Sequence, residues 1–503
     1  MTYFSQNKIR HNENGKMGKL ERGSGVLLHI TSLPNKFGLG TFSSECYNFI
    51  NFLADGGFNT WQVLPFAECG YGLSPYSSIS SFAINKYLID LTEFLSEEEM
   101  MSFGFDKYNT SSMANLYEEE CKFNKALDLV YSKKGNEFDR LKFNKDNAYW
   151  LDDYALFRVC QKLYGAEWVN WPYVIKTRVK TEIAKIQTKY ALDIDKEKFF
   201  QFIADYQWKK IMKYAKEKGI KIFGDIPMYV ELNSVDVWSN QKDWQIEDGV
   251  CKFVAGVPGD YFNPEGQLWG YPLYNYTNMA KNKFTFWKNR IKRVSELFDI
   301  IRIDHFIAFN KYFAIPNGKP ANSGKWVIGP REKVLSVVTK ASRDVLVAED
   351  LGVITEDVIK LKNKFNIPGL KVMQFAFDED GNSAHKPHNF EKSCVAYLGT
   401  HDNDTFMGML NNSDWDKINR FKNYIGIPLE WGNDAVVDKS IECLYRSSAN
   451  LVILTMQDIL KLGSECRMNI PGKPEGNWLW QLENIDMSLT ERYRYLSEIF
   501  NRI

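Results

Sequence analysis

The chain has 503 residues, with 63 basic and 63 acidic side chains, so its formal net charge is zero. A balanced charge gives no electrostatic attraction to nucleic acid or to an anionic membrane, and neither is expected as a partner. Aromatic residues make up 15% of the chain, including 14 Trp, which fits a large aromatic core or platforms on which sugar rings stack.

The cysteine pattern and the N-terminal residues bear on location. The eight cysteines form no CxxC pair and no Cys/His ligand spacing, which favours reduced thiols and gives no zinc site. The first 22 residues lack the apolar core of a signal peptide. No run approaches the roughly 18 uncharged apolar residues that a membrane span needs. We therefore expect a cytoplasmic protein without metal or cofactor, and the sequence does not indicate an oligomeric state.

Short apolar runs recur along the chain, and their nearly continuous hydrophobicity is typical of parallel strands buried on both faces. They begin at Gly25, Thr60, Ile220, Asp299, Val345, Leu370, Cys394 and Leu451. Helical patterns lie between several of them; one spans residues 200–219 and ends at Gly219 as a C-cap. This alternation predicts an α/β protein with a (β/α)8 TIM barrel. A doubly wound open sheet is the alternative, although no GxGxxG or phosphate loop supports a nucleotide site.

Two intervals between the runs are too long for simple loops. Residues 81–200, between strands 2 and 3, are expected to form a mainly helical insertion beside the barrel mouth. Residues 229–284, after strand 3, are rich in Gly, Pro, Trp and Tyr, which is typical of a substrate-binding lid loop. We expect residues 1–503 to form a single catalytic barrel that carries both insertions.

Acidic residues follow three of the predicted strands: Asp304, Glu349 and Asp402. Arg302 and Asp304 are two residues apart on one strand, so their side chains point the same way. The carboxyl ends of the strands of a parallel barrel meet at one rim, where such folds hold their chemistry. Any one of these acids could instead cap a helix or neutralise Arg302. The three together predict a cluster of carboxylates at the barrel mouth.

Glycoside cleavage is a reaction that uses such a cluster without a metal. In retaining enzymes one carboxylate attacks the anomeric carbon and a second, protonated carboxyl frees the leaving oxygen, with the two about 5–5.5 Å apart. We expect Arg302 to keep Asp304 ionised. Burial and neighbouring acids would raise the pKa of Glu349. Asp402 would bind sugar hydroxyls more tightly in the transition state. A metal site is the alternative use of clustered acids, but the few His residues show no ligand spacing.

Longer motifs carry a family resemblance from about Gly23 onward. The chain resembles the 4-α-glucanotransferases of glycoside hydrolase family 77, the amylomaltases or disproportionating enzymes, which are relatives of the α-amylases. The motifs that carry this resemblance are LLHITSLPN, GYGLSPYSSIS, FGDIPMYV, AGVPGDYF, GQLWG, RIDHF, AEDLG, GTHDND, RMNIPG and GNWLW. The resemblance implies a (β/α)8 barrel with helical insertions and no C-terminal β-sandwich.

The resemblance also implies roles for individual residues. Asp304 matches the nucleophile, Glu349 the general acid/base, Asp402 the third carboxylate that binds the donor sugar, and Arg302 the arginine that supports the nucleophile. The residues that match substrate contacts are Ser74, Tyr76, Asp225, Gln267, Trp269 and His401. Tyr271 departs from the family pattern, because relatives often have Asn at this position. The difference puts the acceptor preference in doubt, but not the reaction chemistry.

The predicted function is retaining transfer of an α-1,4-glucan segment to the 4-hydroxyl of an acceptor glucan or glucose through a covalent glycosyl-enzyme. Maltooligosaccharides or other α-1,4-glucans are the expected donors and acceptors. An α-amylase-type hydrolase is the first alternative, since both reactions share their first step and differ in whether water reaches the intermediate. A non-catalytic glucan-binding protein on the same barrel is the second alternative.

Overall fold

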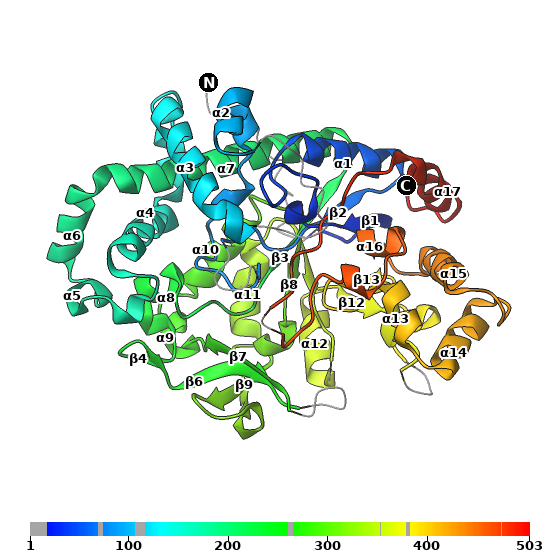
Figure 1. Cartoon of the computed structure of the whole chain (residues 1–503). Helices are drawn as coiled ribbons and strands as arrows, with labels where there is room; N and C mark the ends of the chain where they lie inside the picture. The colour runs from blue at the N-terminus through cyan, green and yellow to red at the C-terminus, as the bar shows by residue number, and fades with distance from the viewer. Residues whose placement is uncertain are drawn as a thin grey trace.

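The fold is built on an eight-stranded parallel sheet (Figure 1). The structure, a computed structural model, describes residues 18–68, 74–105, 116–259, 265–352, 354–378, 383–473 and 475–503. The strands lie in the order β11-β8-β3-β2-β1-β14-β13-β12. Their bounds are β1 Gly23–Leu27, β2 Thr60–Gln62, β3 Lys221–Ile226, β8 Ile300–Ile303, β11 Val345–Ala348, β12 Gly369–Val372, β13 Cys394–Tyr397 and β14 Leu451–Thr455.

The two outer strands of this order meet and close the barrel. The backbone N–H of Ala348, at the end of β11, donates to the carbonyl of Pro368, just before β12, at 2.8 Å. Each of the eight apolar runs in the sequence overlaps one barrel strand. The predicted (β/α)8 barrel is therefore confirmed, and the doubly wound open sheet is wrong.

Side chains alternate between the barrel interior and the layer beneath the helices, as expected for strands buried on both faces. On β8, Ile301 and Ile303 belong to the main core of the protein, whereas Ile300 belongs to the separate cluster inside the barrel. That interior cluster contains Leu27, Phe223, Ile300, Val345, Val347, Leu370, Val372, Val395, Tyr397, Leu451 and Ile453. Parallel pairing sets Asp225 of β3 opposite Arg302 of β8, so two charged side chains share one level of the barrel.

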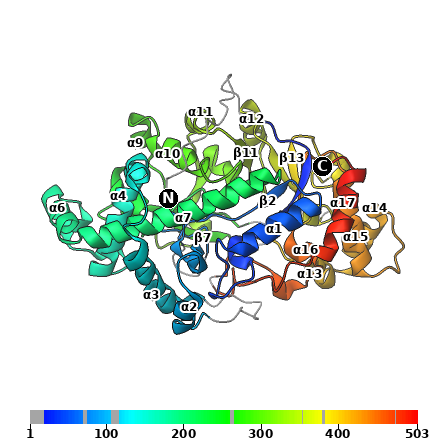
Figure 2. The same cartoon turned by 90° about the horizontal axis from the view of Figure 1, so that it is seen from above.

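Helices surround the barrel, and Figure 2 shows α7 and α1 running side by side along one flank, with α17 beyond α1. The long helix α7, Ala191–Glu217, ends as predicted, because Gly219 adopts a φ of 77° just beyond it. The other helices outside the insertions are α1 Ser44–Asp55, α10 Thr285–Val294, α11 Glu332–Ala341, α12 Glu356–Lys364, α13 Phe406–Asn412, α14 Trp415–Ile425, α15 Asn433–Arg446, α16 Met456–Ile459 and α17 Thr490–Ile499. Among the described residues, no helix is both long and apolar enough to cross a membrane.

A group of helices projects from the barrel between β2 and β3, at the left of Figure 1. It contains α2 Glu97–Ser102, α3 Leu116–Lys134, α4 Leu141–Tyr164, α5 Tyr173–Lys176 and α6 Lys180–Lys189. Helix α7 then passes through residue 200 without a break and leads into β3. The bounds 81–200 of the helical insertion therefore stay a prediction. Residue 200 lies within a continuous helix, so it marks no change in secondary structure.

A second, four-stranded antiparallel sheet lies beside the barrel, in the order β10-β9-β6-β7. Its strands are β6 Phe253–Val257, β7 Gln267–Pro272, β9 Lys311–Pro316 and β10 Lys325–Ile328. The predicted insertion 229–284 also holds α8 Val235–Ser239, β4 Ile246–Glu247, β5 Val250–Cys251 and α9 Tyr276–Lys281. Because β9 and β10 follow β8 in the sequence, the sheet joins this insertion to a segment that we did not predict.

Short 3-10 helices complete the described structure. They are η1 Ile30–Ser32, η3 Lys86–Leu88, η4 Leu91–Glu93, η5 Trp168–Asn170, η6 Gln241–Asp243, η7 Phe306–Phe309, η8 Ala321–Ser323, η9 Met373–Phe375, η10 Pro387–Asn389, η11 Ser464–Cys466 and η12 Met487–Leu489. One of them, η7, directly follows β8 and begins after His305, which has a left-handed φ of 45°.

The junction of β1, β14 and α17 is held by a buried arginine. Arg502 is fully buried, and its guanidinium donates to the backbone carbonyls of Gly23 at 2.9 Å, Tyr445 at 2.8 Å and Ala449 at 3.1 Å. Burial lowers its pKa to about 9. These bonds tie the first barrel strand to the loop before the last one.

Replacing Arg502 by alanine is expected to destabilise the protein by roughly 3–5 kcal/mol, because several buried carbonyls lose their donor at once. The midpoint of urea unfolding, followed by circular dichroism, measures the effect. Arg494→Ala is the matched control: Arg494 donates to the carbonyls of Asp55 and Ala54, but these bonds are exposed, so a small shift is expected. Equal midpoints for the two variants would contradict the anchoring role of Arg502.

Candidate active site

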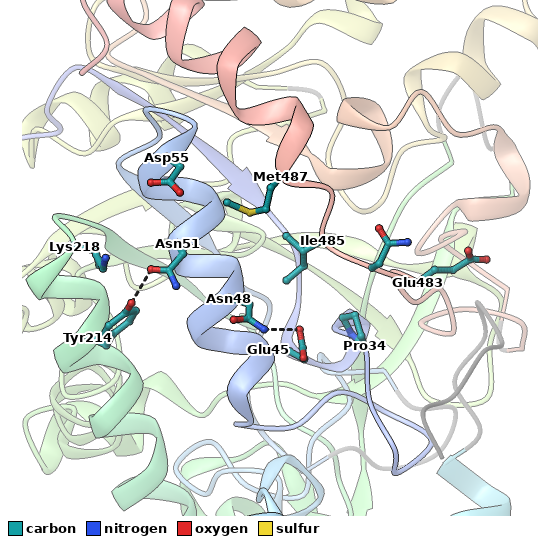
Figure 3. Close-up of a pocket in the computed structure, with 11 residues that line it drawn as sticks. Pro34, Glu45, Asn48, Asn51, Asp55, Tyr214, Lys218, Glu483, Ile485 and Met487 are labelled. Atoms are coloured by element: carbon teal, nitrogen blue, oxygen red, sulfur yellow. Dashed lines mark hydrogen bonds between the residues drawn. The ribbon is translucent and has the colours of Figure 1, made fainter. Parts of the chain in front are cut away.

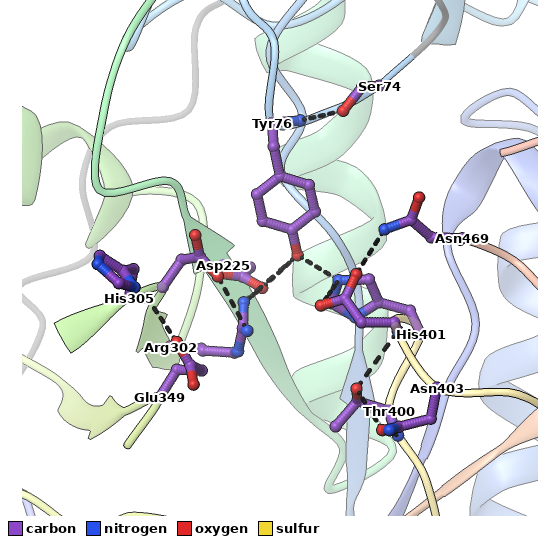
Figure 4. A network of polar contacts seen from close by, with 12 residues as sticks. Ser74, Tyr76, Asp225, Arg302, His305, Glu349, Thr400, His401, Asn403 and Asn469 are labelled. Carbon is purple, nitrogen blue, oxygen red and sulfur yellow. Dashed lines mark hydrogen bonds and ion pairs between the residues drawn. The ribbon is translucent and has the colours of Figure 1, made fainter. Parts of the chain in front are cut away.

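Arg302 is the centre of a polar network at the mouth of the barrel (Figure 4). Its Nη1 lies 2.5 Å from Oδ2 of Asp225, and its Nη2 lies 2.9 Å from Oδ1 of Asp304. The Arg302 and Asp225 side chains are almost completely buried, whereas 28% of the Asp304 side chain is exposed. One guanidinium thus holds a buried carboxylate on the neighbouring strand and orients a second carboxylate that substrate can reach.

Tyr76 joins this network to the loop after β13. Its hydroxyl donates to Oδ2 of Asp225 at 2.7 Å and lies 2.9 Å from Nε2 of His401. The two rings stack, with centroids 5.4 Å apart and an interplanar angle of 8°. Ser74 contributes from the same turn, since its Oγ accepts the backbone N–H of Tyr76 at 3.3 Å. Tyr76 therefore has a fixed orientation at the edge of the site.

Glu349 follows β11 and lies against the backbone next to Asp304. Its Oε2 accepts the N–H of His305 at 2.7 Å, and its Oε1 accepts the N–H of Leu351 at 2.9 Å. His305 directly follows Asp304, and its left-handed φ of 45° is a strained conformation for a non-glycine residue. These contacts hold the carboxyl of Glu349, which follows β11, against the backbone next to Asp304, which follows the neighbouring strand β8.

Asp402 is positioned from a distant loop rather than by a strand. Strand β13 ends at Tyr397, so the alternation that we used for the other acids does not place Asp402. Its Oδ1 accepts from Asn469 at 2.6 Å, and its Oδ2 lies 3.2 Å from Nε2 of His401. Arg467 donates to the carbonyls of Asp402 and Asn469, each at 2.7 Å. Sequence reasoning missed Arg467 and Asn469 as site residues, although both lie in the RMNIPG motif.

The protonation of the site differs from our expectation for one residue. Burial raises the pKa of Glu349, as predicted, and Arg302 and two backbone N–H groups oppose the rise. Burial also raises the pKa of Asp304 well above its usual range, against the ion pair with Arg302. This direction is opposite to the one expected from the prediction that Arg302 keeps Asp304 ionised. The carboxyls of Asp225, Asp304, Glu349 and Asp402 lie around one guanidinium, and this crowding of acids favours retention of a proton by the Asp304–Glu349 pair.

Asp402 and His401, beside the Asp304–Glu349 pair, differ from it in the direction of their pKa shifts. Burial would raise the pKa of Asp402, but His401, Arg302 and Asn469 outweigh it and hold that pKa below its usual range. Burial lowers the pKa of His401, so its ring is neutral at pH 7. An ionised Asp402 and a neutral His401 provide an acceptor and a donor for sugar hydroxyls.

Gln267 and Trp269 lie on the same side of β7 and reach the Glu349 side of the site. The Trp269 ring meets the His305 ring edge-on, with centroids 4.8 Å apart, and its Nε1 donates to Gln267 Oε1 at 3.0 Å. On the same strand, burial raises the pKa of Tyr271, with smaller contributions from the charges of Glu231 and Asp304. The predicted lid loop includes residues 260–264, which lie outside the described residues.

The structure thus gathers the residues predicted from the sequence into two adjoining groups. The first contains Arg302, Asp304, Glu349, Asp225, Tyr76, Ser74, His401 and Asp402. The second contains Gln267 and Trp269, which contact the first through His305. Within the part of the chain that the structure describes, no three His, Cys, Asp or Glu side chains form a set that could hold a metal ion.

Comparison with known proteins identifies the family. The glycoside hydrolase family 77 model, described as 4-alpha-glucanotransferase, matches residues 28–488. The chain belongs to this family. A 4-alpha-glucanotransferase of Aquifex aeolicus is 38% identical over 488 residues, which cover 96% of this chain and 99% of that protein. One from Clostridium butyricum is 37% identical, covering 94% and 100% of the two chains.

Comparison with a solved structure of an amylomaltase supports the same family and the same fold for this chain. The amylomaltase of Streptococcus agalactiae in complex with acarbose is 31% identical and superposes with a TM-score of 0.90, covering 96% of this chain and all of that one. The protein is therefore a glucan-transferring enzyme on a (β/α)8 barrel, as predicted, and its substrates are α-1,4-glucans. Family membership favours transfer over the α-amylase-type hydrolase.

Proposed function

We propose that the enzyme disproportionates maltooligosaccharides by a retaining mechanism in which Asp304 is the nucleophile and Glu349 the general acid/base. The observation that carries this proposal is the hydrogen bond from the backbone N–H of His305 to Glu349, which places the second carboxyl beside the residue that follows Asp304. Retaining glycosidases need their two carboxyls on opposite sides of one anomeric carbon.

In the first step, a carboxylate oxygen of Asp304 attacks the anomeric carbon of the donor as the glycosidic C–O bond breaks. Glu349 gives its proton to the departing oxygen, which becomes the 4-hydroxyl of the released glucan. The product is a glycosyl ester on Asp304 with inverted configuration. The raised pKa of Glu349 supports its role as the proton donor.

In the second step, Glu349 removes the proton from the 4-hydroxyl of an acceptor glucan, and that oxygen displaces Asp304 from the anomeric carbon. The second inversion restores the α-configuration and regenerates both carboxyls. Arg302 stabilises Asp304 as a leaving carboxylate through their 2.9 Å ion pair.

The remaining residues bind the sugars. Asp402 and His401 are proposed to hold hydroxyls of the donor glucose, with Tyr76 packed beside its ring and Asp225 and Ser74 fixing Tyr76. Gln267 and Trp269 lie beside His305, on the Glu349 side, so they are proposed to contact the leaving glucan and then the acceptor.

A cytoplasmic location is part of the proposal. The seven cysteines within the described residues are all free, which suits a reducing compartment. The donors and acceptors expected there are maltooligosaccharides or other α-1,4-glucans.

Incubation with maltotriose tests the proposed reaction. Transfer yields glucose together with maltotetraose and longer chains, while the concentration of reducing ends stays nearly constant. Hydrolysis raises the concentration of reducing ends steadily and yields no longer chains. Chromatographic product profiles combined with a reducing-end assay distinguish the two, and a steady rise in reducing ends without longer products would overturn the proposal.

A further inference from the structure

A groove on the outer flank of the barrel lies apart from the residues of the active site (Figure 3). It has a volume of about 1020 Å³ and lies between α1, the end of α7 and the segment 483–487 that leads into α17. Building on the function proposed above, we propose that this groove is a second binding site for an α-1,4-glucan chain, which tethers long substrates to the enzyme.

One wall of the groove presents hydrogen-bonding groups that are already held in place. The Tyr214 hydroxyl donates to Oδ1 of Asn51 at 2.6 Å, and Asn48 donates through Nδ2 to Glu45 at 3.2 Å. The first bond leaves the Nδ2 protons of Asn51 for a ligand, and the second leaves the Oδ1 of Asn48. A donor and an acceptor one helical turn apart on α1 can pair with sugar hydroxyls at little cost in side-chain entropy.

The opposite wall is partly apolar. Ile485 and Met487 face α1 in Figure 3, and Pro34 closes the end near Glu45. An α-glucan chain has hydroxyl edges and apolar C–H faces, so a groove with one polar and one apolar wall fits both.

The charges of the groove disfavour anionic ligands. Three carboxylates, Glu45, Asp55 and Glu483, line it together with one cation, Lys218. The ammonium of Lys218 lies 5.5 Å from the centre of the Tyr214 ring, so it is held against the aromatic wall. This excess of negative charge disfavours phosphates, nucleic acid and acidic peptides, whereas carboxylates are good acceptors for the hydroxyls of a neutral glucan.

The groove is also linked to the active site by the backbone. Trp478 packs near the stacked rings of Tyr76 and His401, with centroid distances of 5.8 and 5.9 Å. The chain then continues through Leu482, whose N–H donates to Ser32 at 2.8 Å, directly into Glu483 of the groove. A single well-anchored segment therefore forms part of both surfaces, which suits a polymer bound at both.

The double variant Asn48→Ala/Asn51→Ala tests the proposal. Both residues are on solvent-accessible positions of α1, and alanine favours the helix, so folding should be retained. Asn363→Ala, at an exposed position of α12, is the matched control. Affinity for soluble amylose is measured by retardation in native gels, and kcat and KM are measured with amylose and with maltotriose.

We expect the double variant to bind amylose about tenfold more weakly, the loss that corresponds to two hydrogen bonds. Its KM for amylose should rise similarly, whereas its kinetics with maltotriose and the behaviour of Asn363→Ala should match the wild type. Unchanged amylose retardation in the double variant, or a wild type that amylose does not retard, would overturn the second site. A wild type that fails to convert maltotriose would instead overturn the proposed function, whatever the gels show.

Discussion

Replacing Asp304 by alanine is expected to abolish glucan transfer while leaving oligosaccharide binding largely intact. Without its carboxylate, no glycosyl-enzyme can form, so turnover of maltotriose should fall by roughly four orders of magnitude or more. The fold should survive, because Arg302 keeps its buried partner Asp225 at 2.5 Å. Glucose release from maltotriose measures turnover, and calorimetric titration with maltoheptaose measures binding.

Asp195→Ala is the matched control for this experiment. Asp195 pairs with Arg140 at 2.9 Å, the same length as the Arg302–Asp304 pair, but it lies on α7 away from the network. Its loss should leave turnover unchanged. An Asp304→Ala enzyme with substantial activity would remove Asp304 from its role as nucleophile. Binding without turnover in the wild type would favour the non-catalytic glucan-binding protein.

Replacing Glu349 by glutamine is expected to slow turnover of maltotriose by about 10³–10⁴-fold, since glutamine cannot protonate the leaving oxygen. A donor with a good leaving group, such as maltosyl fluoride, needs no such proton in the first step. The loss of rate in that step should therefore be much smaller with the fluoride. The second step still lacks its base, so the glycosyl ester on Asp304 should accumulate and be detectable by mass spectrometry.

The pH profile gives an independent measure of the same residue. Glu349 must be protonated to act as an acid, so kcat/KM of the wild type should fall as pH rises through its raised pKa. The variant should lack this basic limb. Glutamine also offers one oxygen where Glu349 accepts two backbone N–H groups, so a small shift of the side chain is expected as well. Equal losses with maltotriose and with the fluoride would mean that this structural change, rather than the missing proton, causes the defect.

The sequence predicted the barrel well because each of its strands is buried on both faces. Burial on both faces requires an almost continuous apolar run, and such runs stand out at β1, β3 and β14. The strands β9 and β10 did not stand out. Residues Lys325–Ile328 are mostly exposed, so β10 is defined by its pairing with β9 rather than by a hydrophobic pattern.

Local pattern also explains which parts of the site were predictable. Strand alternation correctly set Arg302 and Asp304 on one side of β8, where their side chains form an ion pair. It does not apply to Asp402, whose position depends on Arg467 and Asn469 from a distant loop. The family resemblance, not the residue pattern, supplied the proposed substrate-binding residues. The raised pKa of Asp304 arises from burial in the assembled site, which no short sequence motif encodes.

The contacts of Arg502 have a consequence for how the protein is made. The bond between Arg502 and Gly23 joins residues 479 positions apart, and β1 pairs directly with β14. During synthesis β1 leaves the ribosome early, yet one of its two neighbours is translated only near the end of the 503 residues. Until then the unpaired edge of β1 is open to other strands, so we expect nascent chains to depend on chaperones until the ring closes.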